Sequence, residues 1–302
     1  MRPAPAQLAP LLARLQLPPA KSVSELAGGS YVVYRIELAD GQAVNLKTYD
    51  ELRGKAPERE ARASGLLIEA GLPVSRYLLV DESCSILPYR FALMTHLPGV
   101  SLASLGGTED LADAYRQMGA LLKRVHAVSM PFYGGLDGPG HSANTDSVKE
   151  LAHYAFTQFR RQGADSALAG RLEAAFSDNL DLAGESVGPV FAHDDFQPAN
   201  VLVERSAKGD WQVCGLIDLG NARAADPVQD LAKAMFCTEH MAPGAARLLL
   251  EGYGGVPHPR PERALWFYTL LHRVIMWFWL RQIGAIPAGE HQLIDDLEAM
   301  LA

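Results

Sequence analysis

The hydrophobic pattern of this chain changes its period once, close to residue 97, and this change restricts the possible folds more than any other feature. Over residues 31–38 apolar side chains alternate along the chain, a short turn follows, and residues 43–49 form a second extended run. Together these runs predict a β-hairpin. Beyond the change, apolar residues recur at steps of three and four, as on a helix. We therefore expect an α+β fold of two lobes, a small β-rich N-terminal lobe over residues 1–97 and a larger helical C-terminal lobe over residues 98–302.

One lysine stands out on the second strand of the hairpin. Because side chains alternate across a strand, Val44 and Leu46 share one face, and Asn45 and Lys47 share the other. Lys47 is therefore expected to face away from the hydrophobic core of its own hairpin.

The remainder of the N-terminal lobe is expected to contain two helices and two further strands. The first twenty residues predict a short surface helix. Residues 57–70 predict a helix that Gly71 ends, and residues 77–80 and 91–94 predict strands.

A second hairpin interrupts the helices of the C-terminal lobe. The expected helices lie around residues 109–128, 146–162, 164–180, 228–238, 243–252 and 262–282. The hairpin lies between Val201 and Ile217, with its turn around Gly209. Facing residues of an antiparallel pair sit about 5 Å apart, so its open end would hold Asn200 and Asp218 side by side. Carboxylate and amide oxygens suit magnesium, which takes its remaining ligands from water and phosphates.

The segment from His193 to Asp218 also carries a recognisable pattern. His-x-Asp-x-x-x-x-Asn, followed by Ile-Asp-x-Gly at a strand end, resembles the catalytic and metal-binding motifs of kinases. Shorter motifs make this a resemblance to the aminoglycoside phosphotransferase and small-molecule kinase superfamily, which has a protein-kinase-like fold. These motifs are Arg59-Glu60-Ala61, Leu97-Pro98-Gly99, Val125-His126-Ala127, Ala225-Asp226-Pro227 and Asp230-Leu231-Ala232.

The resemblance implies a role for each matching residue in the transfer of a phosphoryl group from ATP or GTP. Asp195, on the loop before the hairpin, would accept or orient the proton of the substrate hydroxyl. Asn200 and Asp218 would hold Mg²⁺, and Lys47 would contact the α- and β-phosphates.

Other matching residues would support this machinery. Glu60 would pair with Lys47, although Glu58 is close enough in sequence to compete. His193 would brace the catalytic loop, and Asp230 would anchor it from the helix beneath. The backbone N–H groups that could approach phosphate belong to Gly29 and Ser30.

Two residues depart from the family pattern. Asp194 stands where the family usually has Gly, and it is expected to face substrate or solvent. Asn45 stands where the side chain would look toward the nucleotide base, on a wall that is normally apolar. We therefore expect Asn45 to influence the choice between adenine and guanine nucleotides. The connector that includes Thr95 and Leu97 would read the base through backbone groups.

Composition excludes several classes of function. The net charge of -8 argues against a nucleic-acid partner, which needs a concentrated basic surface. The apolar stretch 264–280 contains His272 and Arg273 and is shorter than the roughly 20 residues of a membrane span, so no membrane association is expected. Three cysteines without metal-like spacing are read as reduced thiols of a cytoplasmic protein. We expect a monomer or homodimer.

The resemblance places the substrate between the catalytic loop and the C-terminal helices, where Asp194, His272, Arg273 and Trp277 are candidate contacts. The expected acceptor is a hydroxyl of an aminoglycoside or similar antibiotic, which would make the chain a resistance enzyme. The alternative is a metabolic kinase for choline, homoserine, methylthioribose or a fructosamine. A non-catalytic nucleotide-binding protein fits less well, because Lys47, Asp195, Asn200 and Asp218 are all present.

Overall fold

The computed structural model describes residues 2–26, 31–49, 57–106, 109–287 and 291–302. By their contacts, the residues form two compact units. Unit 1 comprises Met1–Leu105 and Ala199–Asn221, and unit 2 comprises Gly106–Pro198 and Ala222–Ala302. The expected division of the chain at residue 97 stays a prediction, and the hairpin that follows Asn200 groups by contacts with the N-terminal residues.

An antiparallel sheet forms the frame of unit 1. Its five strands lie in the order β1-β2-β3-β5-β4. The strands are β1 (Ala20–Leu26), β2 (Val33–Leu38), β3 (Ala43–Tyr49), β4 (Tyr77–Asp81) and β5 (Arg90–Thr95), and the helices are α1 (Pro5–Arg14) and α2 (Pro57–Glu69). The first hairpin is confirmed, with Ile36 opposite Val44 in the register of β2 and β3.

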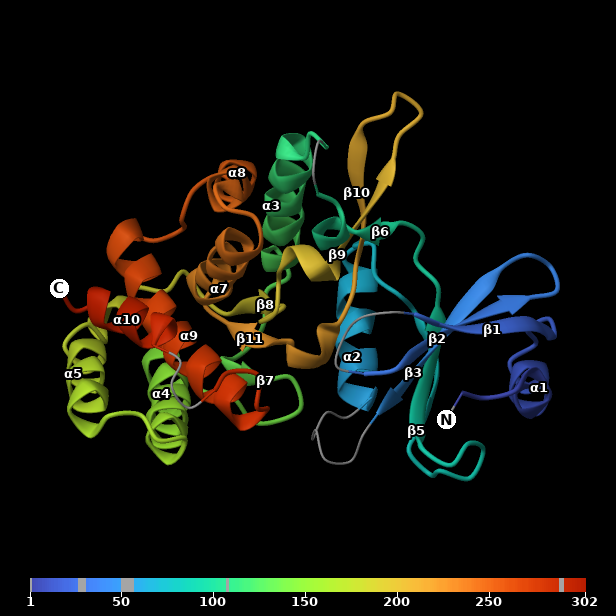
Figure 1. The fold of residues 1–302 in the computed structure, drawn as a ribbon, viewed down its shortest axis with the longest axis horizontal. Coiled ribbons are helices and arrows are strands. Elements are labelled where there is room, and N and C mark those ends of the chain that lie inside the picture. The colour runs from blue at the N-terminus through green and yellow to red at the C-terminus, as the bar shows by residue number, and fades with distance from the viewer. Residues whose placement is uncertain (1, 27–30, 50–56, 107–108, 288–290) are drawn as a thin grey trace. The chain divides into compact units, whose positions relative to one another are not determined.

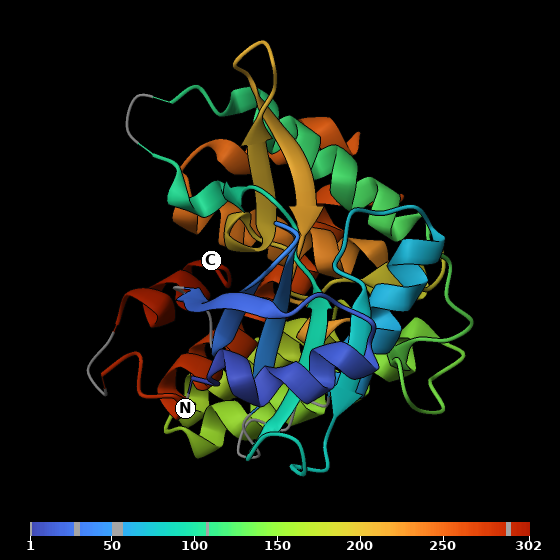
Figure 2. The ribbon, with the colours of Figure 1, turned by 90° about the vertical axis from the view of Figure 1, so that its right-hand side faces the viewer.

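The two helices of unit 1 cover opposite faces of this sheet, as the two views show (Figures 1 and 2). Helix α1 packs on the face that carries Val44 and Leu46, because Leu8, Leu11 and Leu12 share one buried cluster with them. The helix expected here is confirmed, but its apolar side is a component of the core rather than a surface feature. Helix α2 lies on the other face, where β3 presents its polar side chains.

The second hairpin joins unit 1 through two contacts. Its strands β9 (Val201–Arg205) and β10 (Trp211–Leu216) form a small sheet with β6 (Val100–Ser101) in the order β10-β9-β6. Leu216 also makes a parallel bridge to Val74. Gly99 permits the pairing of β6 with β9. It has a positive φ of 99°, and an added Cβ would lie 2.8 Å from the carbonyl oxygen of Val203.

Unit 2 is mainly helical. Its helices are α3 (Ala112–His126), α4 (Asn144–Arg161), α5 (Ser166–Ser177), α6 (Asp181–Gly184), α7 (Pro227–Met241), α8 (Ala245–Tyr253), α9 (Pro261–Gln282) and α10 (Gln292–Ala299). A small sheet of β7 (Gly134–Gly135), β11 (Arg223–Ala225) and β8 (Val190–Ala192) accompanies them. All six helices expected in the C-terminal part are present, and their ends differ from the expected ones by a few residues.

Helices α4, α5 and α9 enclose the main core of unit 2. Phe156, Phe159, Phe267 and Tyr268 are among its most deeply buried residues. Helix α9 is therefore a core helix, as its length and composition indicate. Across the described parts of the chain, no helix combines the length and apolarity that a bilayer crossing requires.

Helices α3 and α8 approach each other closely through two glycines. A Cβ atom added to Gly119 would overlap the carbonyl oxygen of Leu249, and one added to Gly252 would overlap that of Arg116. This contact fixes α3 against the rest of unit 2, and α3 carries His126 at its end.

Candidate active site

A buried ion pair lies between the sheet of unit 1 and α2. The ammonium nitrogen of Lys47 is 2.8 Å from Oε2 and 3.0 Å from Oε1 of Glu60. The two side chains are only 7% and 1% exposed. Strand alternation brings Lys47 to this face, and the first turn of α2 directs Glu60 toward it. Glu58, the competing carboxylate, is exposed, so the partner expected from the motif is the observed one.

Three tyrosines complete the surroundings of this pair. The hydroxyl groups of Tyr49 and Tyr77 donate hydrogen bonds to Oε2 of Glu60, at 3.1 and 2.7 Å. The rings of Tyr31 and Tyr49 lie 5.1 and 5.5 Å from the Lys47 ammonium, within cation–π range. Burial, together with Glu60, raises the pKa of Tyr77 well above its ordinary value, so Tyr77 remains a hydrogen-bond donor.

Asp218 is the second anionic partner of Lys47. Its Oδ1 lies 3.1 Å from the ammonium, and its side chain is 30% exposed. Burial disfavours the charge on Lys47, but Glu60 and Asp218 outweigh it and raise the pKa of the lysine. Lys47 is therefore a permanent cation held between two carboxylates.

The open end of the second hairpin brings Asn200 and Asp218 together, as the sequence predicts. The N–H of Ile217 donates to the carbonyl oxygen of Asn200 at 3.0 Å, which places the residue after Ile217 next to Asn200. Asp218 has a left-handed φ of 60°, and the 3-10 helix Leu219–Asn221 follows it directly.

The donor chemistry of this pair fits magnesium. A carboxylate and an amide oxygen are hard ligands, and magnesium needs few of them because it keeps water and binds phosphate oxygens. Within the described ranges, no cluster of three or more His, Cys, Asp or Glu side chains is arranged to bind a metal. The roles of Asn200 and Asp218 as ligands remain a proposal.

The residues expected near the nucleotide base lie at the start of β3 and at or just beyond the end of β5. Asn45 Oδ1 is 3.2 Å from Nδ1 of His96, so this histidine orients the amide of Asn45. Thr95 accepts a hydrogen bond from the N–H of Arg76 through its hydroxyl. Leu97 is half-buried beside Gly215. Gly29 and Ser30 lie outside the described residues.

In unit 2, a buried aspartate holds the loop that carries Asp195. The carboxylate of Asp230, on α7, accepts the backbone N–H of His193 at 2.7 Å and of Asp194 at 2.9 Å. His126 contributes a third bond to it, at 3.1 Å. Burial acts to raise the pKa of Asp230, but hydrogen bonds from His126 and the loop outweigh it and lower the pKa. This is the geometry that an anchor of the loop requires.

The loop also has a cationic partner that the sequence analysis did not identify. Lys233, one turn further along α7, lies 3.9 Å from Oδ1 of Asp194 and 3.8 Å from Oδ1 of Asp195. It also donates to the carbonyl oxygen of Asp194. Its position three residues after Asp230, on the same face of a helix, is the signal that could have revealed it.

The structure places the expected substrate contacts of α9 in or near the core. His272 is buried, and its Nε2 lies 2.8 Å from the carbonyl oxygen of Gln229. Trp277 is 6% exposed and packs edge-on against Phe159. Arg273 pairs with Asp296 of α10. Burial therefore does not favour the substrate role predicted for His272 and Trp277.

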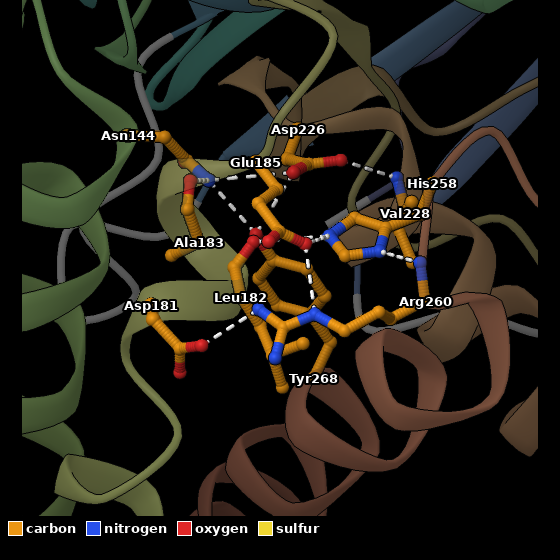
Figure 3. Close-up of polar contacts among 10 residues, drawn as sticks. All are labelled: Asn144, Asp181, Leu182, Ala183, Glu185, Asp226, Val228, His258, Arg260 and Tyr268. Atoms are coloured by element: carbon orange, nitrogen blue, oxygen red, sulfur yellow. Dashed lines mark hydrogen bonds and ion pairs between the residues drawn. The ribbon is translucent and has the colours of Figure 1, made fainter.

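A second polar cluster of unit 2 is structural (Figure 3). Asp226 caps α7 by accepting the N–H of Val228 at 2.7 Å. Its other oxygen accepts from Tyr268 of α9 at 2.9 Å and from Asn144 of α4 at 3.3 Å. Burial raises the pKa of Asp226. The cluster ties three helices together around one fully buried carboxylate.

The same close-up shows how the start of α9 is held (Figure 3). Arg260 pairs with Glu185 at 2.9 Å and with Asp181 at 2.7 Å. Its backbone N–H donates to Nδ1 of His258, whose Nε2 lies 3.1 Å from the carbonyl oxygen of Leu182. This histidine therefore bridges α6 and the segment that leads into α9.

The fold and the site together define a class of protein. The first unit has an antiparallel sheet in which a strand lysine pairs with a helix glutamate. The second unit is helical and carries a His-x-Asp loop. These are the features of the protein-kinase-like arrangement. A family model described as the phosphotransferase enzyme family matches residues 22–265, and the chain belongs to that family.

Individual relatives agree with this assignment. Streptomycin 3''-kinase from Streptomyces griseus is 29% identical over 177 residues, which cover 55% of this chain and 63% of that protein. Aminoglycoside 3'-phosphotransferase from Escherichia coli is 37% identical over 83 residues, or 28% of each chain. The chain thus matches less than two thirds of the length of these curated relatives.

A solved structure supports the fold. Choline kinase LicA from Streptococcus pneumoniae superimposes with a TM-score of 0.64 at 14% sequence identity, over 97% of each chain. At that identity the match establishes the fold alone.

Proposed function

We propose that this protein transfers the γ-phosphoryl group of ATP or GTP to a hydroxyl group of a small molecule. The observation that carries the proposal is the buried Lys47–Glu60 pair with Asp218 beside it. A charged lysine is costly to bury, even between two carboxylates, and a purely apolar packing of similar volume would often be at least as stable. The presence of a charged lysine at this buried position supports a role in binding phosphate.

The reaction would use one residue of the chain as proton acceptor. The acceptor oxygen forms a bond to the γ-phosphorus while the bond from that phosphorus to the β,γ-bridging oxygen breaks. The nucleoside diphosphate leaves with that bonding pair, and the hydroxyl proton passes to Asp195. Lys47 would bind the α- and β-phosphates, and Glu60 would hold the orientation of the lysine.

Asn200 and Asp218 would hold magnesium, since they supply the two oxygen ligands described above. When bound there, magnesium would neutralise charge on the phosphate oxygens of the nucleotide. Asn45, oriented by His96, would contribute to the choice between ATP and GTP.

The acceptor class we propose is the aminoglycosides. The names of both curated relatives refer to aminoglycoside substrates. The net charge of -8 also suits cationic acceptors. The protein would then confer antibiotic resistance, acting in the cytoplasm as a monomer or homodimer. The three cysteines, which are all free, are compatible with that location.

A susceptibility panel tests the acceptor class. The chain is expressed in a sensitive bacterial host, and growth is compared across aminoglycosides, beginning with streptomycin, and across macrolides. We expect the inhibitory concentration of at least one aminoglycoside to rise with the natural chain and to fall back with Asp195→Ala. An unchanged panel, combined with purified enzyme that phosphorylates choline, homoserine, methylthioribose or a fructosamine, would assign the chain to metabolism instead.

A further inference from the structure

Lys233 is a nearly buried cation that the proposed chemistry leaves unexplained. It lies on α7, and its side chain is 15% exposed. The charged and titratable groups that face it are Asp194 and Asp195 of the loop, Asp230 and Cys237 of its own helix, and His272 of α9. Burial disfavours its charge, but the Asp194 and Asp195 carboxylates outweigh that cost and raise the pKa of Lys233.

The loop residue nearest to Lys233 has an unfavourable backbone conformation. Asp194 has a φ of 54°, a left-handed value that is unfavourable for a non-glycine residue. Two hydrogen bonds hold its backbone, one at its N–H and one at its carbonyl oxygen. Asp230 accepts its N–H, and Lys233 donates to its carbonyl oxygen. Asp230 and Lys233, three residues apart on α7, thus bind both backbone polar groups of Asp194.

The same loop brings two adjacent carboxylates into a confined space. Asp194 and Asp195 are 20% and 23% exposed, and each has an oxygen within 4 Å of the Lys233 ammonium, at 3.9 and 3.8 Å. Two carboxylates that share a site without a cation cannot both ionise easily, and the pKa of one rises. A cation between them removes that conflict.

We propose that Lys233 is a positioning residue for phosphoryl transfer, which compensates the charge of Asp194 and thereby keeps Asp195 oriented and ionised as proton acceptor. This inference rests on the proposed role of Asp195. It also explains why an acidic residue is tolerated directly before Asp195, because the charge of Asp194 has a dedicated partner on α7.

A double-mutant cycle between Lys233 and Asp194 tests the inference. Lys233→Met removes the ammonium and keeps most of the stem. Asp194→Asn removes one carboxylate charge and places a residue that tolerates left-handed φ. The variants are Lys233→Met, Asp194→Asn and the double variant, with Lys149→Met on the exposed side of α4 as the matched control. Turnover of magnesium-ATP is measured with water as the acceptor, over a range of pH.

We expect Lys233→Met to lower kcat by about tenfold or more, with little change in KM for ATP. We also expect it to move the acidic limb of the kcat profile to higher pH, because two adjacent carboxylates would then share the site without a cation. In the Asp194→Asn background the same substitution should change kcat by less than about threefold, and the acidic limb should stay in place. The Lys149→Met control should match the natural chain.

Equal losses in the two backgrounds, or a loss of thermal stability without a shift of the pH profile, would overturn the proposal. If Lys233→Met does not fold, the kcat of Asp194→Asn is compared with the kcat of the double variant instead. An inactive double variant refutes the proposal, and an active one supports it. Failure of the proposed function looks different, since the natural chain would then show no turnover that Asp195→Ala abolishes, and both proposals would fall together.

Discussion

Neutralising Glu60 is the perturbation whose effect the structure defines best. Glu60→Gln keeps the shape of the side chain but removes its charge, so that Lys47 retains Asp218 as its only described anionic partner at 3.1 Å. The two bonds at 2.8 and 3.0 Å from the lysine would be reduced to one weaker bond to an amide oxygen. The amide nitrogen would also face a donor in either orientation, because Lys47 contacts both oxygens of Glu60. At the Oε2 position it would meet the hydroxyl groups of Tyr49 and Tyr77 as well.

The magnitude follows from the burial of the pair. Removing one partner of a buried ion pair costs about 3–5 kcal/mol, because the other charge is left poorly compensated. Asp218 remains close to Lys47, so we expect the lower end, a loss of about 3 kcal/mol in the free energy of unfolding. Urea unfolding followed by circular dichroism measures this loss. Glu58→Gln is the matched control, since Glu58 lies in the same turn of α2 and is exposed.

The control should change the free energy of unfolding by less than about 0.5 kcal/mol. A difference between Glu60→Gln and Glu58→Gln below about 1 kcal/mol would refute the reasoning, because a buried charge cannot lose its partner at so small a cost.

Two further predictions concern unit 2. Gly119→Ala should destabilise the protein by about 2 kcal/mol or more, because the added Cβ would overlap a carbonyl oxygen of α8. Gly170→Ala is the control, and it should be neutral or stabilising because the space around Gly170 is open. Thermal unfolding of the two variants measures the difference. Burial lowers the pKa of His272 from its ordinary 6.5 to about 4. The folded protein therefore keeps its full stability above pH 6.5, where this histidine is neutral in both the folded and the unfolded chain. Stability is lost as the pH falls from 6.5 toward 4, because only the unfolded chain then binds the proton readily. Relative to His272→Gln, the natural chain should lose about 3 kcal/mol of unfolding free energy between those pH values, and parallel pH profiles for the two proteins would contradict this.

The local features of the proposed nucleotide site could be predicted from the sequence, because they depend on residues that are close together along the chain. Strand alternation separates Lys47 from Leu46, and hairpin pairing brings Asn200 and Asp218 together across one turn. Motif position favours Glu60 over Glu58 as the partner of Lys47, and the hydrogen bonds of Lys47 to Glu60 show that pairing.

The features that the sequence did not predict depend on tertiary contacts. Strand β1 has a single buried residue, Val23, and so lacks the alternation that identifies a strand. The contact of Lys233 with Asp194 and Asp195 joins residues almost forty positions apart. The spacing of Lys233 from Asp230 indicates a shared face of α7, but it does not specify the contact itself. Similarly, the hydroxyl of Tyr77 reaches Glu60 only because β4 lies beside α2.

Direct transfer of the γ-phosphoryl group is the measurement that tests the central claim. Purified protein is incubated with γ-labelled ATP, magnesium and streptomycin or another acceptor that the susceptibility panel identifies, and label in the acceptor is counted. The account predicts label in the acceptor with the natural chain, and a loss of about a hundredfold or more in rate with Asp195→Asn, whose amide cannot accept the hydroxyl proton. Label transfer that Asp195→Asn leaves unchanged, or no transfer to any hydroxyl acceptor by folded natural protein, would contradict the account.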